Sequence, residues 1–200
     1  MSRKIDILSI IEGHWYSLRN PDGSFNIFDF CTFVVLPLVL GSLSAYSIAE
    51  VSTDTISLLV NFGSIFTALL LSVLVLIFDQ ENKIDEHYEK YLIFKEELEK
   101  NPNLIDSPAY TYIFSKNLDE NYGLKKTLLK ELYFNISFSI VVSLFLVLLC
   151  LAHSKLSDYQ NVSNLCILMR VVIFFIAVNV TTLFLNILMI VKRMHVMLTS

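Results

Sequence analysis

The side chains best suited to metal binding or to nucleophilic and acid–base chemistry in this sequence are its four histidines and three cysteines. The histidines lie far apart, at His14, His87, His153 and His195. His87 directly follows Asp85 and Glu86, but successive residues of a helix point in different directions, so these side chains do not converge on one metal ion. The cysteine spacing matches no zinc motif. We therefore expect neither a metal site nor any other cofactor.

Motifs that would indicate a particular reaction are also missing from the sequence. The five glycines are scattered singly, and there is no phosphate-binding loop, GxSxG or HExxH pattern. The middle thirds of the apolar segments contain no Asp, Glu or Lys, the usual carriers in proton relays and ion-coupled transporters. A net charge of −4 without a basic patch argues against direct nucleic-acid binding. The sequence thus predicts a protein that is not an enzyme.

Four uncharged segments dominate the chain: 30–49, 55–78, 132–152 and 171–191. Each is about 20 residues long, which is enough to cross a bilayer as a helix. Hydrophobic residues make up 54% of the chain and charged residues only 17%, against about a quarter in soluble domains. Four helices this apolar would leave a soluble fold of 200 residues too little polar surface. We predict an all-α, four-helix transmembrane protein in contact with membrane lipid.

Lysine and arginine predict the orientation of these spans. Eight lysines lie in the segment between spans two and three, whereas the two outer links contain only Lys155. The positive-inside rule therefore places both termini and the central segment in the cytoplasm. No cleavable signal peptide is expected, because the first apolar segment begins only near residue 28. The predicted division is an amphipathic N-terminal segment, a hairpin, a cytoplasmic helical stalk, a second hairpin and a tail: 1–27, 28–79, 80–131, 132–191 and 192–200.

Residues 3–18 predict an amphipathic helix. Apolar side chains recur at three-to-four spacing at Ile5, Leu8, Ile11 (or Glu12), Trp15 and Leu18. One placement puts this helix on the inner leaflet with Trp15, the sole tryptophan, at headgroup level. The other packs it on the cytoplasmic stalk of its own fold. At the opposite membrane face, Arg170 near the outer end of span four is expected to reach the interface.

Small and polar residues within the spans favour close helix packing. Gly41 and Ala45 share one face of span one, and Asn61 and Gly63 lie in span two. Asn179 in span four is expected near mid-membrane, where an interhelical hydrogen bond would satisfy it. The alternative is a polar face that lines a pore. Pro37 is expected to kink span one.

The central segment predicts a helix that leaves the membrane and ends at Asn101–Pro102–Asn103, so that one helix runs from about 56 to 100. A second, short helix is expected over about 109–118 and should end at Asn121–Tyr122–Gly123; the alternative is a strand, because Tyr110, Tyr112 and Phe114 alternate as they would in a strand. Aromatic residues flanked by acids suit a docking surface for a soluble partner, although a self-packed cytoplasmic hairpin explains them equally. These residues are Tyr88, Tyr91, Phe94, Tyr110, Tyr112 and Phe114.

Two of the cysteines, Cys150 and Cys166, are expected near the outer face. A disulfide between them is conceivable in an oxidising compartment. The interpretation we favour is that they pack as ordinary small apolar residues.

The overall layout resembles the membrane subunit of the Kiwa anti-phage defence system. The resemblance rests on the length of the chain, the N-terminal segment 1–26, the short outer links and the acidic stalk of residues 79–100. It covers the whole chain and is one of architecture, without a diagnostic motif. It implies a bacterial inner-membrane protein that senses phage attachment. It also implies a homo-oligomer, as a tetramer, and a soluble cytoplasmic DNA-binding partner subunit.

Two functional hypotheses follow. The first is a non-enzymatic sensor or scaffold that self-associates through its spans and docks a soluble partner through 80–131. The second is an oligomeric pore-forming effector or small channel that uses the Ser, Thr and Asn faces of spans one and four. An immunity-type protein that blocks a toxin within the bilayer also fits the size of the chain.

Overall fold

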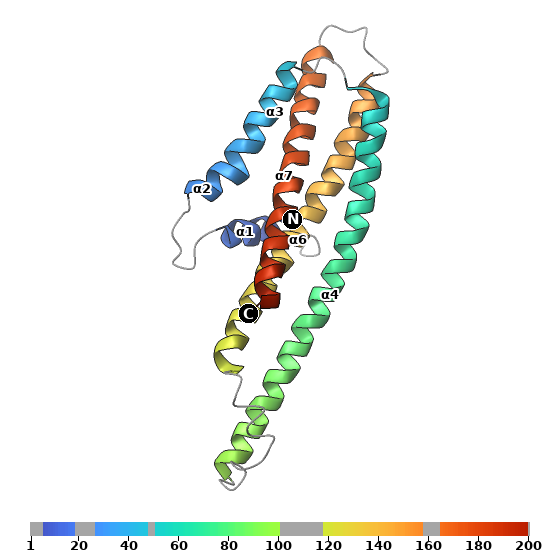
Figure 1. Cartoon of the computed structure of the whole chain (residues 1–200). Helices are drawn as coiled ribbons and strands as arrows, with labels where there is room; N and C mark the ends of the chain where they lie inside the picture. Colours follow the sequence, from blue (N-terminus) through green and yellow to red (C-terminus); the bar gives the residue numbers. More distant parts are fainter. Residues whose placement is uncertain (1–5, 19–26, 48–50, 101–117, 158–164, 200) are drawn as a thin grey trace.

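The computed structural model describes residues 6–18, 27–47, 51–100, 118–157 and 165–199, and within these ranges every element is helical and there is no strand. The all-α prediction is therefore confirmed. In chain order the elements are α1 (Ile7–Ser17), α2 (Ile27–Phe30), the π-helix η1 (Cys31–Val35), α3 (Leu36–Ser47), α4 (Thr53–Lys100), α6 (Leu118–Ser157) and α7 (Leu165–Thr199) (Figure 1).

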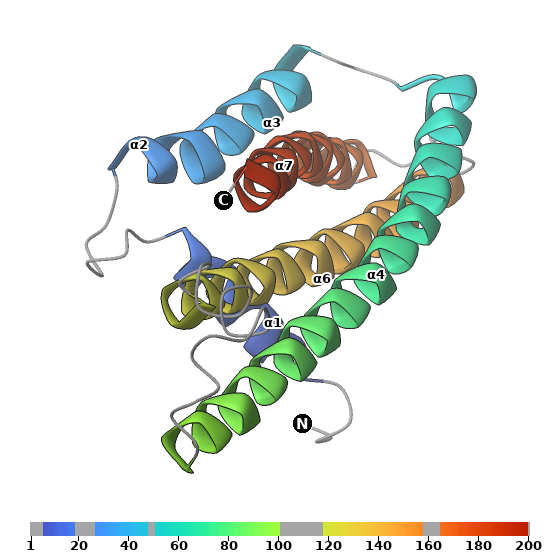
Figure 2. The same ribbon diagram turned by 60° about the horizontal axis from the view of Figure 1, so that its bottom comes forward.

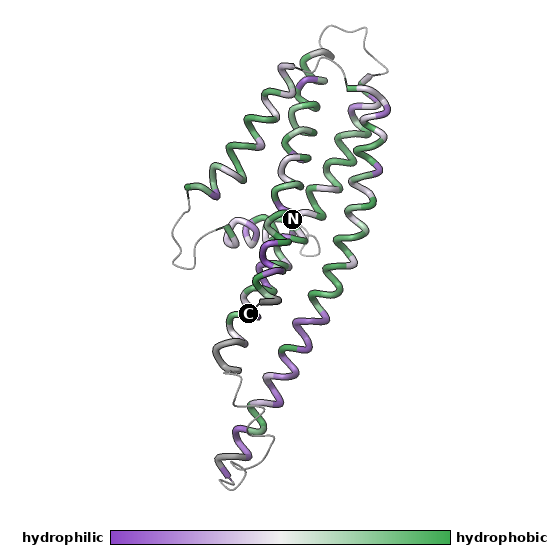
Figure 3. The backbone as a smooth tube through the Cα atoms, viewed as in Figure 1, coloured by the Kyte–Doolittle hydropathy of each residue, from purple (hydrophilic) through white to green (hydrophobic). Residues whose placement is uncertain are grey.

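Four helices are long and apolar enough to cross a membrane, as predicted: Ile27–Ser47, Thr53–Glu97, Tyr122–Ser157 and Ile167–Met197. In Figure 3 most of the length of these helices has the colour of hydrophobic residues, whereas the lower part of α4 is largely hydrophilic. We call the end of the molecule where α4 and α6 extend past the other helices the stalk end. The opposite end, where α3 ends and α4 begins, is the distal end.

The helices lie side by side in the order α3, α7, α6 and α4, so that α6 and α7 are central and α3 and α4 are the flanks (Figures 1 and 2). The segment 132–191 is accordingly a packed pair, α6 against α7. The segment 28–79 is not, because α3 packs against α7 and α4 packs against α6. Figure 2 shows α3 and α4 on opposite sides of the molecule. Each flanking helix is thus held by one of the central helices rather than by the other flanking helix, which neighbours it in sequence.

Glycine allows the close approach of both flanking helices. A Cβ added at Gly41 would lie 2.5 Å from Cγ2 of Val178 and 3.1 Å from the carbonyl oxygen of Phe174, both on α7. A Cβ added at Gly63 would lie 2.8 Å from Cγ2 of Val147 on α6. Gly41 and Gly63 are therefore helix-packing residues, and the helices that they contact belong to the same chain.

The other three predicted packing residues behave differently. Ala45 is half-buried on α3, in keeping with a packed position. Asn61 is exposed on α4, so it does not pack within the chain. Asn179 is buried, but its Nδ2 donates to the carbonyl oxygen of Phe175 one turn earlier in α7 (2.7 Å) rather than to another helix. A short polar side chain within a helix can satisfy itself in this way, which removes the need for a partner across the interface.

Buried apolar side chains form two clusters along α6. The distal cluster joins Leu146 and Cys150 of α6 to Ile56 of α4 and to Val172 and Ile176 of α7. The cluster nearer the stalk is built around Leu129, Leu132 and Ile136 of α6, packed against Leu70 and Ile77 of α4 and Ile190 of α7. Since both clusters contain residues of α4, α6 and α7, these three helices form one packed body.

Span one changes helix type just before its proline. Cys31–Val35 is a π-helix, and the Leu36 N–H donates to the carbonyl oxygen of Cys31 five residues earlier. Pro37 has no N–H, and its ring disfavours a regular α-turn immediately before it. The wider π-turn is one way to accommodate the proline within a helix.

The stalk helices are continuous with the spans. α4 runs for 48 residues to Lys100, as predicted from the sequence, and at 1.5 Å per residue it is about 70 Å long. The helix end expected at Asn121–Tyr122–Gly123 is wrong, because α6 begins at Leu118 and passes through these residues. A single glycine costs a helix only about 1 kcal/mol, and Tyr122 contributes contacts to α4 that are described below. The short helix expected before residue 118 lies outside the described residues.

The close approach at Gly41 yields a first test. Gly41→Leu would force a side chain into Val178 and the α7 backbone, and overpacking of this kind costs about 1–3 kcal/mol of the free energy of unfolding. We expect a lower thermal unfolding midpoint for this variant in detergent. Gly123→Ala is the matched control, because a Cβ there meets nothing within 4 Å and alanine favours the helix. Equal midpoints for Gly41→Leu and the wild type would contradict the packing of α3 on α7.

Candidate functional site

The N-terminal helix α1 packs against α6 at the stalk end of the spans (Figures 1 and 2). Gly13 makes this possible, because a Cβ there would lie within 2.3 Å of the Phe134 ring of α6. Next to it, the His14 ring stacks on Phe138 with centroids 4.0 Å apart and planes 6° from parallel. At the start of α1 the Asp6 carboxylate accepts from the Ser9 N–H (3.2 Å) and caps the helix.

The face of α1 that packs is not the predicted apolar stripe. His14 and Ser17 are buried, whereas Leu8 is 63% exposed and Trp15 is 37% exposed. Ile5 lies outside the described residues. The helix does pack on its own fold, but against Phe134, Asn135 and Phe138 in the third apolar segment rather than against the stalk of residues 80–131. The exposed Leu8 and Trp15 leave a second apolar face, and the position of Trp15 at a membrane interface stays a prediction.

Polar side chains from three helices hold α1 in place. We call this group the docking cluster and define it as His14, Ser17, Glu131, Asn135 and Arg193. Asn135 Oδ1 lies 2.8 Å from His14 Nδ1 and 2.8 Å from Ser17 Oγ. With the amide in this orientation its oxygen only accepts, so a neutral His14 donates from Nδ1. Asn135 is fully buried on α6.

Arg193 joins the C-terminal helix to the same cluster. Its Nη2 donates to the backbone carbonyl oxygen of Ser17, at the end of α1. Its Nη1 lies 2.9 Å from Oε2 of Glu131, as an ion pair whose angle falls outside hydrogen-bond geometry. A cation that contacts the last carbonyls of a helix stabilises that end of the helix. Arg193 therefore ties α1, α6 and α7 together at one point.

Burial controls the charges in the docking cluster. Desolvation lowers the pKa of His14 to about 4, the hydrogen bond to Asn135 opposes this shift, and the positive charge of Arg193 adds to it. Burial also lowers the pKa of Arg193, and the carboxylates of Glu131 and Asp29 oppose that shift. His14 is thus neutral at pH 7, and α1 is held by the neutral hydrogen bonds of His14 and Ser17 and by the charged hydrogen bond from Arg193, which is itself paired with Glu131.

A cavity of about 200 Å³ adjoins the docking cluster between α1, the π-helix and α7. Its wall is mostly apolar, with Trp15, Pro37 and Phe138 among the lining residues. Asn186 also lines it and is fully buried, and neither atom of its amide group has a hydrogen-bond partner in the described part of the chain. Buried amides without partners are rare, so this cavity is suited to hold a small polar molecule or water beside α1.

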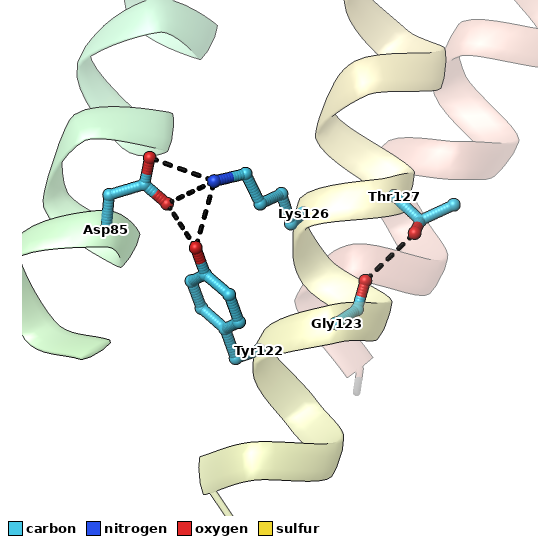
Figure 4. Close-up of polar contacts among 5 residues, drawn as sticks. All are labelled: Asp85, Tyr122, Gly123, Lys126 and Thr127. Carbon is cyan, nitrogen blue, oxygen red and sulfur yellow. Dashed lines mark hydrogen bonds and ion pairs between the residues drawn. The ribbon is translucent and has the colours of Figure 1, made fainter. Parts of the chain in front are cut away.

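A second group of polar contacts ties the stalk helices together (Figure 4). Lys126 Nζ of α6 donates to both carboxylate oxygens of Asp85 on α4, at 2.9 and 3.1 Å. Tyr122 Oη donates to Asp85 Oδ1 (2.8 Å) and accepts from Lys126 (2.9 Å). Hydrogen bonds from Lys126 and Tyr122 lower the pKa of Asp85. Since the pair is nearly half exposed, it contributes at most about 1 kcal/mol to the free energy of unfolding.

Most of the predicted docking aromatics in the described stalk pack within the chain. The Tyr88 ring stacks on Tyr122 at 3.8 Å and also on Tyr91. Tyr91 is only 6% exposed, and Phe94 is half-buried. Tyr91 is therefore a core residue of the stalk rather than an exposed docking residue. Tyr110, Tyr112 and Phe114 lie outside the described residues.

The remaining predicted positions are Arg170, the cysteines and the expected absence of a metal site. Arg170 is exposed near the beginning of α7, at the distal end. Cys150 is a buried free thiol in the distal cluster, which agrees with apolar packing and not with a disulfide. In the described part of the chain no group of three or more His, Cys, Asp and Glu side chains could hold a metal ion. The docking cluster itself was not foreseen, although Asn135 near the end of an apolar segment was a usable signal.

Comparison of the chain with protein-family models, with curated proteins and with solved structures found no match.

The buried neutral His14 predicts that the attachment of α1 depends on pH. A histidine released into water has a pKa of about 6.5, whereas in the docked state it is about 4. Between these values the released state binds more protons, so docking is fully stable above about pH 6.5 and weakens as the pH falls toward 4. Trp15, the sole tryptophan, lies beside His14. We expect its fluorescence emission to change in this range.

His14→Phe should abolish this change, because phenylalanine retains the ring stack on Phe138 but does not titrate. His87→Gln on the exposed stalk is the matched control and should titrate as the wild type does. A pH response that persists unchanged in His14→Phe would show that another group is responsible.

Proposed function

We propose that this chain is a non-enzymatic membrane subunit that acts as a sensor or scaffold and docks a soluble partner through its stalk. The observation that carries the proposal is the continuity of α4, which runs without a break from the distal end to Lys100. The half of α4 that ends at Lys100 is rich in charged residues, and hydrogen bonds of Asp85 with Tyr122 and Lys126 connect it to α6. A rigid helix pair of this kind suits the presentation of a binding surface outside the bilayer.

The exposed apolar residues of the stalk define where a partner would bind. Leu92 is 41% and Ile93 is 54% exposed on α4, next to the buried Tyr91. They are flanked by the exposed acids Glu89 and Glu96. An apolar centre with a charged rim is typical of protein–protein interfaces. Leu92 and Ile93 replace Tyr91 as the proposed contact residues.

The layout shared with the Kiwa membrane subunit suggests the biological setting of this proposal. It favours a bacterial inner membrane with both termini in the cytoplasm, a DNA-binding partner subunit and a role in anti-phage defence. The distribution of lysine and arginine supports the same orientation.

A pull-down from the native host tests the stalk. Leu92→Ser with Ile93→Ser should leave expression and membrane insertion unchanged, because both side chains are exposed, and should abolish co-purification of a stoichiometric soluble protein. Leu124→Ser, on the exposed side of α6 in the same stalk, is the matched control and should retain the partner. If no soluble protein co-purifies with the wild type, or if the double variant retains it, the docking proposal fails at this surface.

Asn61 supports the proposal that copies of the chain associate. It is exposed on α4 at the third turn from the distal end, well inside the apolar span. A primary amide facing lipid gains about 0.6–2 kcal/mol when it finds a hydrogen-bond partner on another helix. Gly41 and Gly63 are already used within the chain, which makes the Asn61 face of α4 the better surface for a second copy.

Asn61→Leu should therefore shift the protein toward the monomer. The expected change is about three- to thirtyfold in the self-association constant, the equivalent of the hydrogen bond just described. Mass photometry or light scattering in a mild detergent would measure it, with Ser42→Leu on α3 as a control, because Ser42 is also exposed and its hydroxyl is bonded within its own helix. An unchanged molecular mass for Asn61→Leu would place the subunit contact elsewhere.

The pore hypothesis has less support from the polar groups of the spans. Asn179 and Thr181 of α7 donate to backbone carbonyls one turn earlier in the same helix, and Ser42 of α3 does the same. Polar side chains that already have a hydrogen-bond partner within their own helix do not need a water-filled pore to satisfy them. Induced alone, a scaffold leaves the membrane potential of cells unchanged, whereas a pore depolarises them.

A further inference from the structure

A second cavity, of about 370 Å³, lies at the distal end, far from the docking cluster and the stalk. The first turn of α4, the last turns of α6 and one residue of α7 line it. The residues that matter below are Ser52, Ser57, His153, Ser154, Ser157 and Met169. The volume falls within the range of small-molecule sites in proteins.

His153 marks this cavity as a binding site. The side chain is 98% buried (2% exposed), and neither ring nitrogen has a hydrogen-bond partner in the described part of the chain. A neutral imidazole has one N–H donor and one acceptor nitrogen. Leaving each of them buried and unpaired is costly, and native structures avoid it. A molecule that both accepts and donates hydrogen bonds at His153 would remove that cost.

The lining defines the chemistry of such a molecule. Among the described residues, no charged side chain lines the cavity, and the described charged residues that adjoin the lining in sequence, Asp54, Lys155 and Arg170, are exposed. A charged ligand would lose its hydration without gaining a counter-charge. Ser57 of α4 and Ser154 and Ser157 of α6 are among the lining residues, and a hydroxyl both donates and accepts, although Ser157 already donates to the carbonyl oxygen of Ser154. Met169 adds an apolar wall.

We propose that this cavity binds an uncharged polyhydroxyl group, of the size of glycerol or a monosaccharide. One ligand hydroxyl accepts from the imidazole N–H of His153 and a second donates to its other nitrogen, while the serines bind the rest. The cavity lies where the spans end, so the group can come from a free sugar or polyol or from the headgroup of a neutral glycolipid. This site goes beyond the proposed function, because its occupancy can be measured without any partner protein.

Saturation-transfer difference NMR tests the free-ligand source. The full chain is purified in a polyoxyethylene detergent, because the sugar headgroups of maltoside detergents would compete for the site. D-glucose and glycerol are the probes, and their signals should saturate with concentration. His153→Phe should weaken binding about tenfold or more, as expected when a hydrogen-bonded pair is lost. His87→Phe on the exposed stalk is the matched control and should bind as the wild type does.

A second variant keeps the test decisive if His153→Phe fails to fold. Ser57 lies at the rim of the cavity and is exposed, so Ser57→Leu fills the space without disturbing the core. It should abolish binding while the thermal midpoint in detergent stays unchanged.

Nanodiscs distinguish the lipid source. Monoglucosyldiacylglycerol added to phosphatidylglycerol nanodiscs should raise the thermal midpoint of the wild type and not that of Ser57→Leu. A response only in nanodiscs assigns the site to a lipid headgroup, and a response to free glucose or glycerol assigns it to a soluble ligand. If neither the sugars nor the glycolipid bind, or if both variants respond as the wild type does, water alone fills the cavity and the proposal is wrong.

Discussion

The hydrophobic effect does not drive helices together in a bilayer, because lipid tails are as apolar as the side chains of the helices. Helices in a membrane therefore associate through close van der Waals contact and hydrogen bonds. In this protein the close contacts converge on α6. Leu132, Ile136, Leu146 and Cys150 of α6 have no exposed surface. α1, α4 and α7 all pack against α6. α3 is the exception, because it packs against α7 and reaches α6 only through that helix.

Hydroxyl groups complete this packing where side chains are small. Thr67 of α4 lies with its Oγ1 2.7 Å from Oγ of Ser143 on α6, one turn from the close approach at Gly63. Each hydroxyl has a single proton, so one of them donates across the interface, while the other donates to a backbone carbonyl oxygen of its own helix, Gly63 for Thr67 or Ile140 for Ser143. No polar group at this contact therefore depends on water, and the interface can lie inside lipid.

The number and length of the helices could be predicted because hydropathy is a local property of the sequence. The four apolar segments, the continuity of α4 and its end at Lys100 all followed from composition and breaker residues. The neighbour of each helix did not follow. That α3 packs on α7 rather than on α4 depends on Gly41 meeting Val178 and Phe174, a match of shapes that no single segment encodes.

The polar face by which α1 packs was not predicted, for a different physical reason. An apolar stripe normally marks the buried side of a helix, but here His14 and Ser17 are buried because Asn135 and Arg193 supply their hydrogen bonds. The partners lie 118 or more residues away in sequence. Tyr91 is a second such case, because it is buried in the stalk although it was expected at the surface.

The two ends of the molecule are joined by continuous helices that are long and apolar enough to cross a bilayer. In a helix each turn is bonded to the next, so a displacement at one end is carried as a shift or rotation of the whole element rather than absorbed locally. The exposed pair of Asp85 and Lys126 is weak, but the stack of Tyr88 on Tyr122 and the apolar cluster around Leu129 and Ile77 keep α4 joined to α6. The stalk must therefore move as a pair of helices, and any event at the distal end that tilts α4 also moves the surface that carries Leu92 and Ile93.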